Sequence, residues 1–349
     1  MFLLVQCLAL TRHKRKPPTK HIEAPAEEVR GDVSLEGERQ PPEVTQPPAG
    51  PLVVLVLSSS PRGGSTLLTD LLSAVQGSVV VFEPLWLIEK TKCFHDMACI
   101  NRYLSDVLSC RFTSDFEDWL KSKNLFFHFF SPEARRCLLL GIPAKKQACL
   151  KAMDLRERCR SAPVVVVKVI RARLAWMMKF LEDPHLNLKV IHLTRDPRGS
   201  INSISRFGWN ADPYLRCSDL QDDMQIYKKL RQVFPSTVTQ VHYEQLCLRP
   251  LETTKDILSF LFGNATLPAS IRDFVEQHML NSKGNGGNMS TFKNSTAEFE
   301  AWRYKISEKW LKAIEAEPVC VQAIKGMKHT LFGSISAAND SKIPLILNT

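Results

Sequence analysis

Short apolar runs rich in β-branched residues recur along the chain, and each of them ends at polar or turn-forming residues. They occupy residues 52–57, 79–82, 164–170, 188–193 and 238–243. Helical patterns, with apolar residues three and four positions apart, lie between these runs at residues 66–75, 174–181, 220–233 and 251–262. Runs without polar alternation are typical of parallel strands that are covered on both faces. The sequence therefore predicts an α/β fold, a doubly wound sheet of about five parallel strands flanked by helices, with a ligand at the carboxyl ends of the strands.

The composition changes near residue 52 and divides the chain. Residues 1–10 are apolar, but they fall far short of the roughly 20 residues that a membrane helix needs, and basic residues follow them instead of preceding them. We interpret them as a truncated signal anchor, with a cleaved signal sequence as the alternative. Residues 11–51 are polar and hold eight prolines, which predicts an extended stem. A single folded domain is expected over residues 52–335, followed by a C-terminal tail at 336–349.

The formal net charge of +10 indicates anionic partners. Charge alone does not choose among nucleotide phosphates, nucleic acid, anionic glycans and a membrane surface. The sequence has neither a basic helix nor a strand in which basic and aromatic residues alternate, so we expect no nucleic acid partner.

The cysteines and the glycosylation sequons both point to the lumen of the secretory pathway, where disulfides and glycans form. Four Asn-X-Ser/Thr sequons begin at Asn264, Asn288, Asn294 and Asn339. The ten cysteines lack the CxxC pairs and histidine partners of a zinc site, so we expect no metal. Nine cysteines remain beyond Cys7, and at least one of them must be unpaired or bridge to another chain. Several fall in residues 92–159, which we interpret as an irregular insertion.

A candidate phosphate-binding loop follows the first apolar run and precedes a predicted helix. Its residues are Pro61, Arg62, Gly63, Gly64, Ser65, Thr66 and Leu67. A loop between a strand and a helix turns backbone N–H groups and the helix N-terminus towards one point, which suits an anion. The glycines allow the backbone to approach a phosphate closely, the two hydroxyls add donors, and Arg62 adds a permanent positive charge.

Two alternatives remain open for this loop taken alone. A P-loop kinase or nucleoside triphosphatase requires a lysine in the pattern G-x-x-x-x-G-K-[ST], and Gly64 stands at that position. The second apolar run also ends in Glu83-Pro84 where an Asp for Mg²⁺ would be expected. An ordinary connection between a strand and a helix is the other alternative, so the loop needs a second site to support it.

The second site follows the apolar run 188–193. It comprises Arg195, Asp196, Pro197, Arg198, Gly199, Ser200, Ile201, Asn202 and Ser203. The chain turns at the proline and begins a helix at about Gly199, so that Arg195 and Ser203 can converge on one phosphate. The alternative is a surface turn with a local ion pair.

Together the two motifs resemble the carbohydrate sulfotransferase family, over residues 52–333. In that family the first loop binds the 5′-phosphosulfate of 3′-phosphoadenylyl sulfate (PAPS), and an Arg-Asp-Pro-Arg segment with a later Ser binds the 3′-phosphate. Further matches follow in the family's order, at Phe82-Glu83-Pro84-Leu85, Cys217, His242-Tyr243-Glu244-Gln245-Leu246 and Trp302-Arg303. The chain is most similar to the Golgi enzymes that sulfate the 6-hydroxyl of galactose, N-acetylglucosamine or N-acetylgalactosamine. It reads Gly-Gly-Ser-Thr where many relatives read Ser-Gly-Ser-Ser.

The resemblance implies a P-loop-like fold and transfer of a sulfuryl group from PAPS to a sugar hydroxyl, in a glycan such as a keratan or chondroitin chain, without a metal. Arg62 would stabilise the leaving oxygen, Ser65 and Thr66 would bind the 5′-phosphate, and Glu83 would act as the base. The alternatives for Glu83 are an ion pair with Arg62 or a cap on the loop, and a histidine such as His192 is the rival base.

The resemblance also implies a Golgi membrane protein of type II topology with a luminal catalytic domain and a glycoprotein or proteoglycan chain as its partner. Assembly into a homodimer is left open. A non-catalytic, basic binding protein that keeps the fold is the remaining alternative to an enzyme.

Five other residues have two interpretations each. Glu244 is expected to brace the sheet through a nearby arginine and not to contact substrate. Lys168, Arg171 and Arg173 either contact an anionic glycan or form a solvated basic edge. Trp302 either packs in the core or closes over the nucleotide.

Overall fold

The computed structural model describes residues 50–120, 129–263, 266–281 and 294–347, and in these ranges it contains a six-stranded sheet of order β3-β2-β4-β1-β5-β6. The strands are β1 (Leu52–Ser58), β2 (Val79–Phe82), β3 (Phe129–Phe130), β4 (Val164–Val169), β5 (Leu188–Thr194) and β6 (Val238–His242). Five strands pair in parallel, as predicted. The short β3 pairs antiparallel with β2 at the edge of the sheet and was not predicted.

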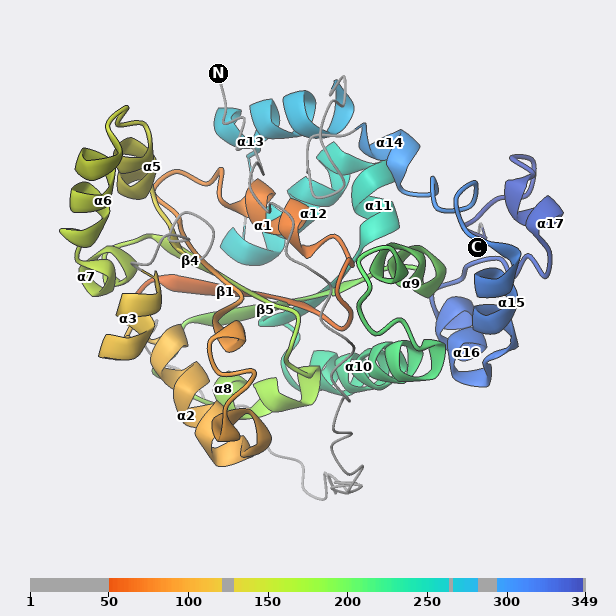
Figure 1. Ribbon diagram of the computed structural model, residues 1–349, viewed down its shortest axis with the longest axis horizontal. Helices are drawn as coiled ribbons and strands as arrows, with labels where there is room; N and C mark the ends of the chain where they lie inside the picture. The colour runs from red at the N-terminus through yellow and green to blue at the C-terminus, as the bar shows by residue number, and fades with distance from the viewer. Residues whose placement is uncertain (1–49, 121–128, 264–265, 282–293, 348–349) are drawn as a thin grey trace, which may run out of the picture. The chain divides into compact units, whose positions relative to one another are not determined.

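Helices cover both faces of this sheet (Figure 1). They are α1 (Ser65–Leu72), α2 (Met97–Leu108), α3 (Ser114–Leu120), α5 (Pro132–Leu138), α6 (Pro143–Lys151), α7 (Leu155–Arg160), α8 (Met178–Leu181), α9 (Pro197–Ser205), α10 (Pro213–Val233), α11 (Tyr243–Leu248), α12 (Pro250–Phe262), α13 (Ala269–Phe274), α14 (Ser295–Glu298), α15 (Glu308–Ala316), α16 (Pro318–Gly326) and α17 (Ile335–Asn339). Each of the four predicted helical patterns corresponds to a helix or helical turns. The predicted doubly wound α/β fold is confirmed.

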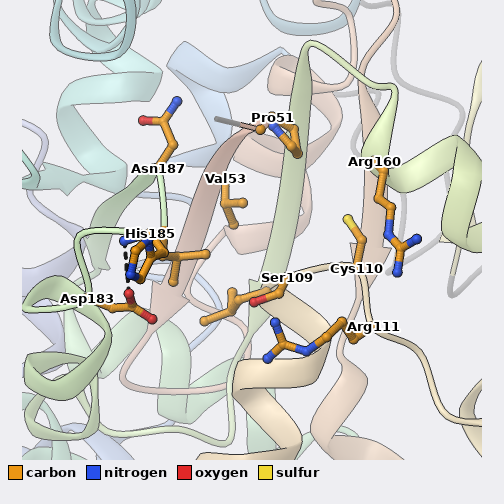
Figure 2. Close-up of a pocket in the computed structure, with 12 residues that line it drawn as sticks. Pro51, Val53, Ser109, Cys110, Arg111, Arg160, Asp183, His185 and Asn187 are labelled. Atoms are coloured by element: carbon orange, nitrogen blue, oxygen red, sulfur yellow. Dashed lines mark hydrogen bonds between the residues drawn. The ribbon is translucent and has the colours of Figure 1, made fainter. Parts of the chain in front are cut away.

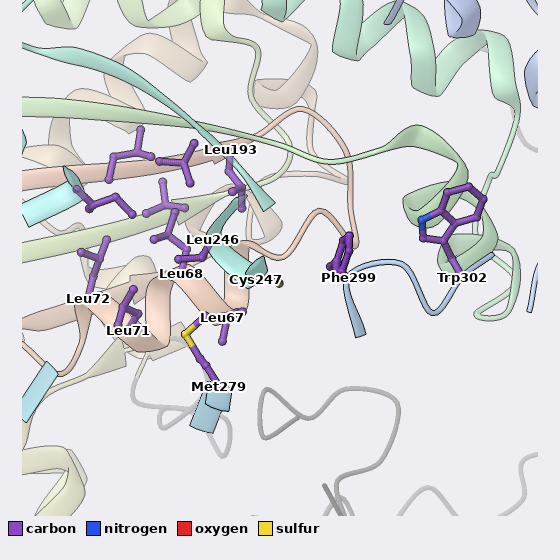
Figure 3. Close-up of a cluster of buried hydrophobic side chains, with 14 of the residues drawn as sticks. Leu67, Leu68, Leu71, Leu72, Leu193, Leu246, Cys247, Met279, Phe299 and Trp302 are labelled. Carbon is purple, nitrogen blue, oxygen red and sulfur yellow. The ribbon is translucent and has the colours of Figure 1, made fainter. Parts of the chain in front are cut away.

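Alternate residues of β1 serve the two cores. Val53, Leu55 and Leu57 belong to the core under α2, α3, α8 and α10, whereas Val54 and Val56 belong to the core under α1, α12 and α15. Figure 3 shows part of the second core, where leucines of α1 lie beside Leu193 and Leu246. A strand that is buried on both faces has no polar alternation, which explains its continuous apolar sequence.

The order of the strands determines which loops meet. Strand β1 lies between β4 and β5, in register with both, so the loops that follow β1 and β5 leave the same edge of the sheet side by side. The chain runs to β2 and β4 on one side of β1 and to β5 and β6 on the other. This is the point in a doubly wound sheet where ligands bind.

Residues 92–159 contain more regular structure than the sequence indicated. Asp96 caps α2 by accepting a hydrogen bond from the Ala98 N–H at 2.9 Å, and the apolar residues at helical spacing in α2 are buried. Disulfides join Cys93 to Cys99, Cys110 to Cys159, Cys137 to Cys149 and Cys217 to Cys320. The interpretation of this segment as irregular was therefore wrong, because short capped helices held by disulfides do not need long apolar patterns.

Cys247 is buried and takes part in no disulfide of the described residues, which agrees with the expectation of at least one unpaired cysteine. Cys7 lies outside the described residues. In the ranges that the structure covers, no helix is both long enough and apolar enough to cross a membrane.

Residues 336–347 pack on the domain and are not a separate tail. The fully buried Arg303 donates hydrogen bonds to the carbonyl oxygens of Ala338 at 2.6 Å, Asp340 at 2.7 Å and Ile343 at 3.0 Å. The folded unit therefore extends beyond the expected boundary at residue 335.

Candidate active site

Two glycines shape the loop between β1 and α1. Gly64 has a φ of +94°, and a Cβ at this position would overlap the ring of Tyr243. A Cβ at Gly63 would overlap the Oγ of Ser58, which itself donates a hydrogen bond of 2.8 Å to the carbonyl oxygen of Ser60. The two glycines therefore allow the loop to fold tightly against Tyr243 and onto itself.

The N-terminus of α1 is suited to an anion. Gly64 occupies the N-cap position without a side-chain hydrogen bond, and the first turn of the helix has no acidic residue. The first N–H groups of a helix have no partner within the helix and carry a partial positive charge. Ser65 and Thr66 begin this helix, so their hydroxyls lie next to these N–H groups.

Arg62 joins the two predicted motifs. Its Nε donates a hydrogen bond of 3.1 Å to the Oγ of Ser203, and its guanidinium lies 4.8 Å from the centroid of the Phe207 ring. Burial lowers the pKa of Arg62, the positive charge of Arg195 lowers it further, and Tyr243 opposes this change. Two arginines held close together in a partly buried site form a place where an anion is favourable.

Arg195 is held in place by groups on two elements, the loop after β1 and α11. Its Nη1 donates a hydrogen bond of 2.8 Å to the carbonyl oxygen of Arg62, and its guanidinium lies 4.2 Å from the centroid of the Tyr243 ring. Its Nε is buried and has no hydrogen-bond partner within the described residues. A Cβ at Gly199 would lie 3.3 Å from this Nε and 2.9 Å from Trp302 Cδ1, so this glycine gives Arg195 its room.

The structure assigns Asp196 and Arg198 to the interior and not to the surface of the site. Both side chains are fully buried, and the Nη2 of Arg198 lies 2.7 Å from Asp196 Oδ2. The Nη1 of Arg198 contacts Glu315 at 2.6 Å and donates to the Thr330 carbonyl oxygen at 2.7 Å. His329 Nδ1 lies 3.0 Å from Asp196 Oδ2. The alternative of a local ion pair is thus correct for these two residues, although the pair is buried and not at the surface.

Most of the remaining residues of this motif also lie inside, whereas Ser203 is half-buried. Ile201 belongs to the core, and Ser200 Oγ donates a hydrogen bond of 3.2 Å to the Pro197 carbonyl oxygen within α9.

The Trp302 side chain is buried beside Phe332, and their ring centroids lie 6.2 Å apart. Trp302 therefore packs in the core.

Glu83 lies at the end of β2 in an unusual backbone conformation. Its φ is +51°, and Arg62, with a φ of +63°, shares this left-handed region. Non-glycine residues with positive φ are uncommon, and the strain that they store is often found at functional sites. Both candidate catalytic residues are thus held by the fold in conformations that their side chains disfavour.

Two cations hold the Glu83 carboxylate. Lys168 Nζ lies 2.5 Å from Oε1, and Arg171 Nη1 pairs with Oε2. The Glu83 side chain is 14% exposed, so it is accessible from one side. The partners of Glu83 therefore come from the end of β4 and the segment that follows it.

The predicted basic edge is partly buried and paired with carboxylates. Burial lowers the pKa of Lys168, while Glu83 raises it. Arg173 pairs with Asp219 at 3.0 Å and with Asp223 at 3.3 Å, on α10. The interpretation as a solvated basic edge is therefore wrong, because carboxylates from β2 and α10 neutralise it, and contact with an anionic glycan stays a prediction.

The structure also contains a buried polar network beneath the loop between β1 and α1, which was not predicted from the sequence. Ser59 Oγ and His192 Nε2 lie 2.8 Å apart, and Gln240 Nε2 lies 3.1 Å from His192 Nδ1. Asp223 Oδ1 accepts a hydrogen bond of 2.9 Å from the Leu174 N–H, and burial raises the pKa of Asp223 to about 6. A histidine within a strand that is otherwise apolar was the available signal.

His192 does not fit the role of a base. Burial lowers its pKa to about 3, with smaller contributions from His242 and Arg173. The side chain is fully buried and supports Ser59.

Glu244 is fully buried as well, and its Oε1 accepts a hydrogen bond of 2.9 Å from the Asp196 N–H. It therefore braces the loop after β5 through the backbone and not through an arginine.

A separate cavity lies at the end of the strands opposite to the candidate active site (Figure 2). It has a volume of about 390 Å³ and is lined by residues that include Pro51, Val53, Arg160, His185 and Asn187. Pro51 and Asn187 directly precede β1 and β5, so the cavity is at the amino ends of the strands. It contains none of the predicted site residues.

Comparison with known proteins gives one family for this chain. The family described as "Sulfotransferase family" matches residues 54–266. Human carbohydrate sulfotransferase 5 is 25% identical over 84% of this chain and 81% of its own length. Human carbohydrate sulfotransferase 3 is 25% identical over 85% of this chain and 71% of its own.

A solved structure is also similar. The sulfotransferase domain of the Synechococcus PCC 7002 olefin synthase aligns with 82% of this chain and 98% of its own, at 21% identity and a TM-score of 0.45.

Proposed function

The chain belongs to the sulfotransferase family, and from this premise we propose that it transfers a sulfuryl group from PAPS to a hydroxyl group of a glycan. The contact between Arg62 Nε and Ser203 Oγ carries the proposal, because it brings the two phosphate motifs into one site. The names of the related carbohydrate sulfotransferases support a sugar as the acceptor. We assign the 6-hydroxyl of galactose, N-acetylglucosamine or N-acetylgalactosamine as the acceptor group, as the sequence resemblance implies.

The residues present fit PAPS. The N–H groups at the start of α1, together with Ser65 and Thr66, would hold the 5′-phosphate. Arg195 and Ser203 would hold the 3′-phosphate, and the buried Arg195 Nε, which has no partner among the described residues, supports this assignment. The position of Gly64 against Tyr243 keeps side chains out of the cradle.

Sulfuryl transfer breaks the bond between sulfur and the bridging phosphate oxygen and forms a bond between sulfur and the acceptor oxygen. The electron pair of the broken bond stays on the phosphate oxygen, and adenosine 3′,5′-bisphosphate leaves. Arg62 would stabilise the negative charge that develops on this oxygen. The acceptor hydroxyl loses its proton, which Glu83 would accept.

The ion pairs of Glu83 fix the geometry of its carboxylate. Lys168 and Arg171 each bind one of its oxygens, and the remaining lone pairs can accept a hydrogen bond from the acceptor hydroxyl. A base in this position would act on a hydroxyl whose acidity rises as the bond to sulfur forms.

The structure argues against a P-loop kinase or nucleoside triphosphatase. The required lysine would stand at Gly64, where a φ of +94° and the Tyr243 ring leave no space for a side chain. A non-catalytic protein that keeps the fold has no need for strained backbone at both Arg62 and Glu83.

We further propose that the enzyme works in the Golgi lumen, attached to the membrane through an N-terminal signal anchor. The four disulfides and the exposed sequon residues Asn294 and Asn339 support a luminal domain. Residues 1–10 lie outside the described residues, as do the sequon residues Asn264 and Asn288. We expect no metal and no nucleic acid in this function, and a homodimer stays open.

The test is to incubate the full chain with ³⁵S-labelled PAPS and a panel of unsulfated oligosaccharides. We expect label on at least one sugar, and a kcat lower by about two orders of magnitude or more in Glu83→Gln, as for the loss of a general base. Binding of adenosine 3′,5′-bisphosphate should be unchanged in this variant. Absence of transfer to every acceptor by the wild-type chain would overturn the proposal.

A further inference from the structure

An exposed tryptophan stands beside the proposed reaction site. Trp209 is 45% exposed, and its ring centroid lies 5.5 Å from that of Phe207, with the planes tilted by 33°. Phe207 also contacts the Arg62 guanidinium, at 4.8 Å. The Phe207 ring thus lies between the exposed indole and Arg62, the side chain that we propose to stabilise the leaving group.

The loop that carries this indole is well fixed. Gly208, three residues beyond the end of α9, has a φ of +69°, a conformation that glycine adopts without strain. Arg216 holds the loop by donating from Nε and Nη2 to the Asn210 carbonyl oxygen, at 2.8 and 2.7 Å. Asp212 caps the start of α10. Tryptophan is enriched at binding interfaces because its large ring combines an apolar face with a polar N–H group.

A second exposed tryptophan adjoins the other reacting group. Trp86 is 46% exposed, and it ends the 3₁₀ turn η1 (Pro84–Trp86). The backbone N–H of Trp86 donates a hydrogen bond of 3.0 Å to the carbonyl oxygen of Glu83. Strand β4 separates β1 from β2, so the loops with Arg62 and Glu83 begin about 10 Å apart, twice the usual spacing of strands.

We propose that Trp209 and Trp86 form the aromatic walls of the acceptor subsite and bind the pyranose ring by its apolar face. This inference rests on the proposed function. The attacking hydroxyl must contact the sulfur between Arg62 and Glu83, so the sugar ring that bears it lies within a few bond lengths of both side chains. The face of an indole is electron-rich and attracts the C–H groups of a sugar ring.

The chemistry of these walls also indicates which part of the acceptor they recognise. An indole has no charge with which to select a sulfate or carboxylate group. It selects the stacked ring face, and therefore the shape of the sugar that is to be modified. The basic side chains nearest to Glu83, Lys168 and Arg171, are already paired with it, so they do not compete for this recognition.

The test uses Trp209→Ala, Trp209→Phe and Trp86→Ala in the full chain. The matched control is Phe262→Ala, because Phe262 is also 45% exposed but lies at the end of α12. The Phe260 carbonyl oxygen in the same helical turn accepts a hydrogen bond from Lys189, which is near the amino end of β5 and not at the carboxyl end, where the proposed site lies. In both alanine variants we expect the acceptor KM to rise about tenfold. The phenylalanine variant should show a smaller rise, and the control none. The dissociation constant of adenosine 3′,5′-bisphosphate should not change.

An active wild-type chain whose acceptor KM stays within about twofold in both alanine variants would overturn the inference and leave the proposed function intact. Equal losses in nucleotide affinity would also overturn it, because the rings would then serve the donor. A wild-type chain without transferase activity contradicts the proposed function instead. In that case binding of the same oligosaccharides, measured by isothermal titration calorimetry, decides the inference: loss of binding in the alanine variants supports it, and unchanged or absent binding overturns it.

Discussion

The Nε of Arg62 donates a hydrogen bond of 3.1 Å to the Oγ of Ser203, although 141 residues separate them in the chain. Ser203 lies on α9 after β5, whereas Arg62 lies in the loop after β1, and the two strands are neighbours. The contact places Arg62, the candidate for stabilising the leaving group, beside the candidate 3′-phosphate site. Any ligand that spans the two loops must therefore meet both residues.

The first prediction concerns how the site discriminates between nucleotides. The wild-type chain should bind adenosine 3′,5′-bisphosphate more tightly than adenosine 5′-monophosphate, because Arg195 meets the additional phosphate. Arg195→Ala should weaken binding of the bisphosphate by about tenfold or more, as expected for a charged hydrogen bond, and leave the monophosphate unchanged. Isothermal titration calorimetry measures both. Arg249→Ala, at an exposed arginine, is the control, and an equal loss for both nucleotides would contradict the assignment of Arg195.

A second prediction tests the packing of Gly64 against Tyr243. Gly64→Ala introduces a Cβ that overlaps the Tyr243 ring at a φ of +94°, so the loop must move and affinity for adenosine 3′,5′-bisphosphate should fall by at least about tenfold. Gly263→Ala is the matched control, because Gly263 also has a positive φ of +78° but a Cβ there would meet no described atom within 4 Å. The control should lose about 1–2 kcal/mol of stability from its backbone conformation alone, with unchanged affinity. Equal affinities in the two variants would contradict a role for the close packing.

The third prediction concerns the buried pair of Asp196 and Arg198. Asp196→Asn leaves a fully buried guanidinium without one of its two carboxylate partners, and the expected loss is about 3–5 kcal/mol in the free energy of unfolding. Denaturant unfolding measures this loss. Glu252→Gln, in the exposed pair with Arg249, should change stability by less than about 1 kcal/mol. A similar small effect for both variants would show that the buried pair is not structural.

The fourth prediction is a dependence of stability on pH. Burial lowers the pKa of His329, but its hydrogen bond to Asp196 and the charge of that carboxylate raise it by more, so the folded pKa lies above the ordinary value of 6.5. A raised pKa means that the folded state binds the proton more tightly than the unfolded state does. The stabilisation is therefore complete below about pH 6.5 and is lost as the pH rises through the folded pKa.

Thermal unfolding of the wild-type chain and His329→Gln at about pH 6 and about pH 9 measures this dependence. The difference in stability between the two proteins should shrink at the higher pH. A difference that stays constant or grows with pH would contradict a protonated His329 paired with Asp196.

The sheet and the two loops could be predicted from the sequence because their signals are local. An apolar run followed by glycines and hydroxyls indicates a strand, a loop and a helix N-terminus whatever the neighbours are. The partners of Glu83 could not be predicted in the same way. Lys168 reaches Glu83 only because β4 is inserted beside β2. A pattern of apolar residues predicts the strands but not their order in the sheet.

Long-range pairing also explains the different role of Arg198. Within its motif this arginine resembles a phosphate ligand, but Glu315 and the Thr330 carbonyl oxygen come from segments more distant in the chain and bind it inside the fold. The network of Ser59, His192 and Gln240 was missed for the same reason, since its members come from three elements. Sequence motifs indicated which segments meet, and the packing determined which side chains face the ligand.

The central claim is that Arg62 assists departure of the phosphate oxygen during sulfuryl transfer. The most direct measurement is the rate of transfer of ³⁵S-sulfate from labelled PAPS to an oligosaccharide acceptor by the wild-type chain, Arg62→Ala and the surface control Arg249→Ala. The account predicts transfer by the wild type and the control, and a kcat lower by about 10²–10³-fold in Arg62→Ala, as for removal of a preorganised donor. Transfer by Arg62→Ala at the wild-type rate would contradict it.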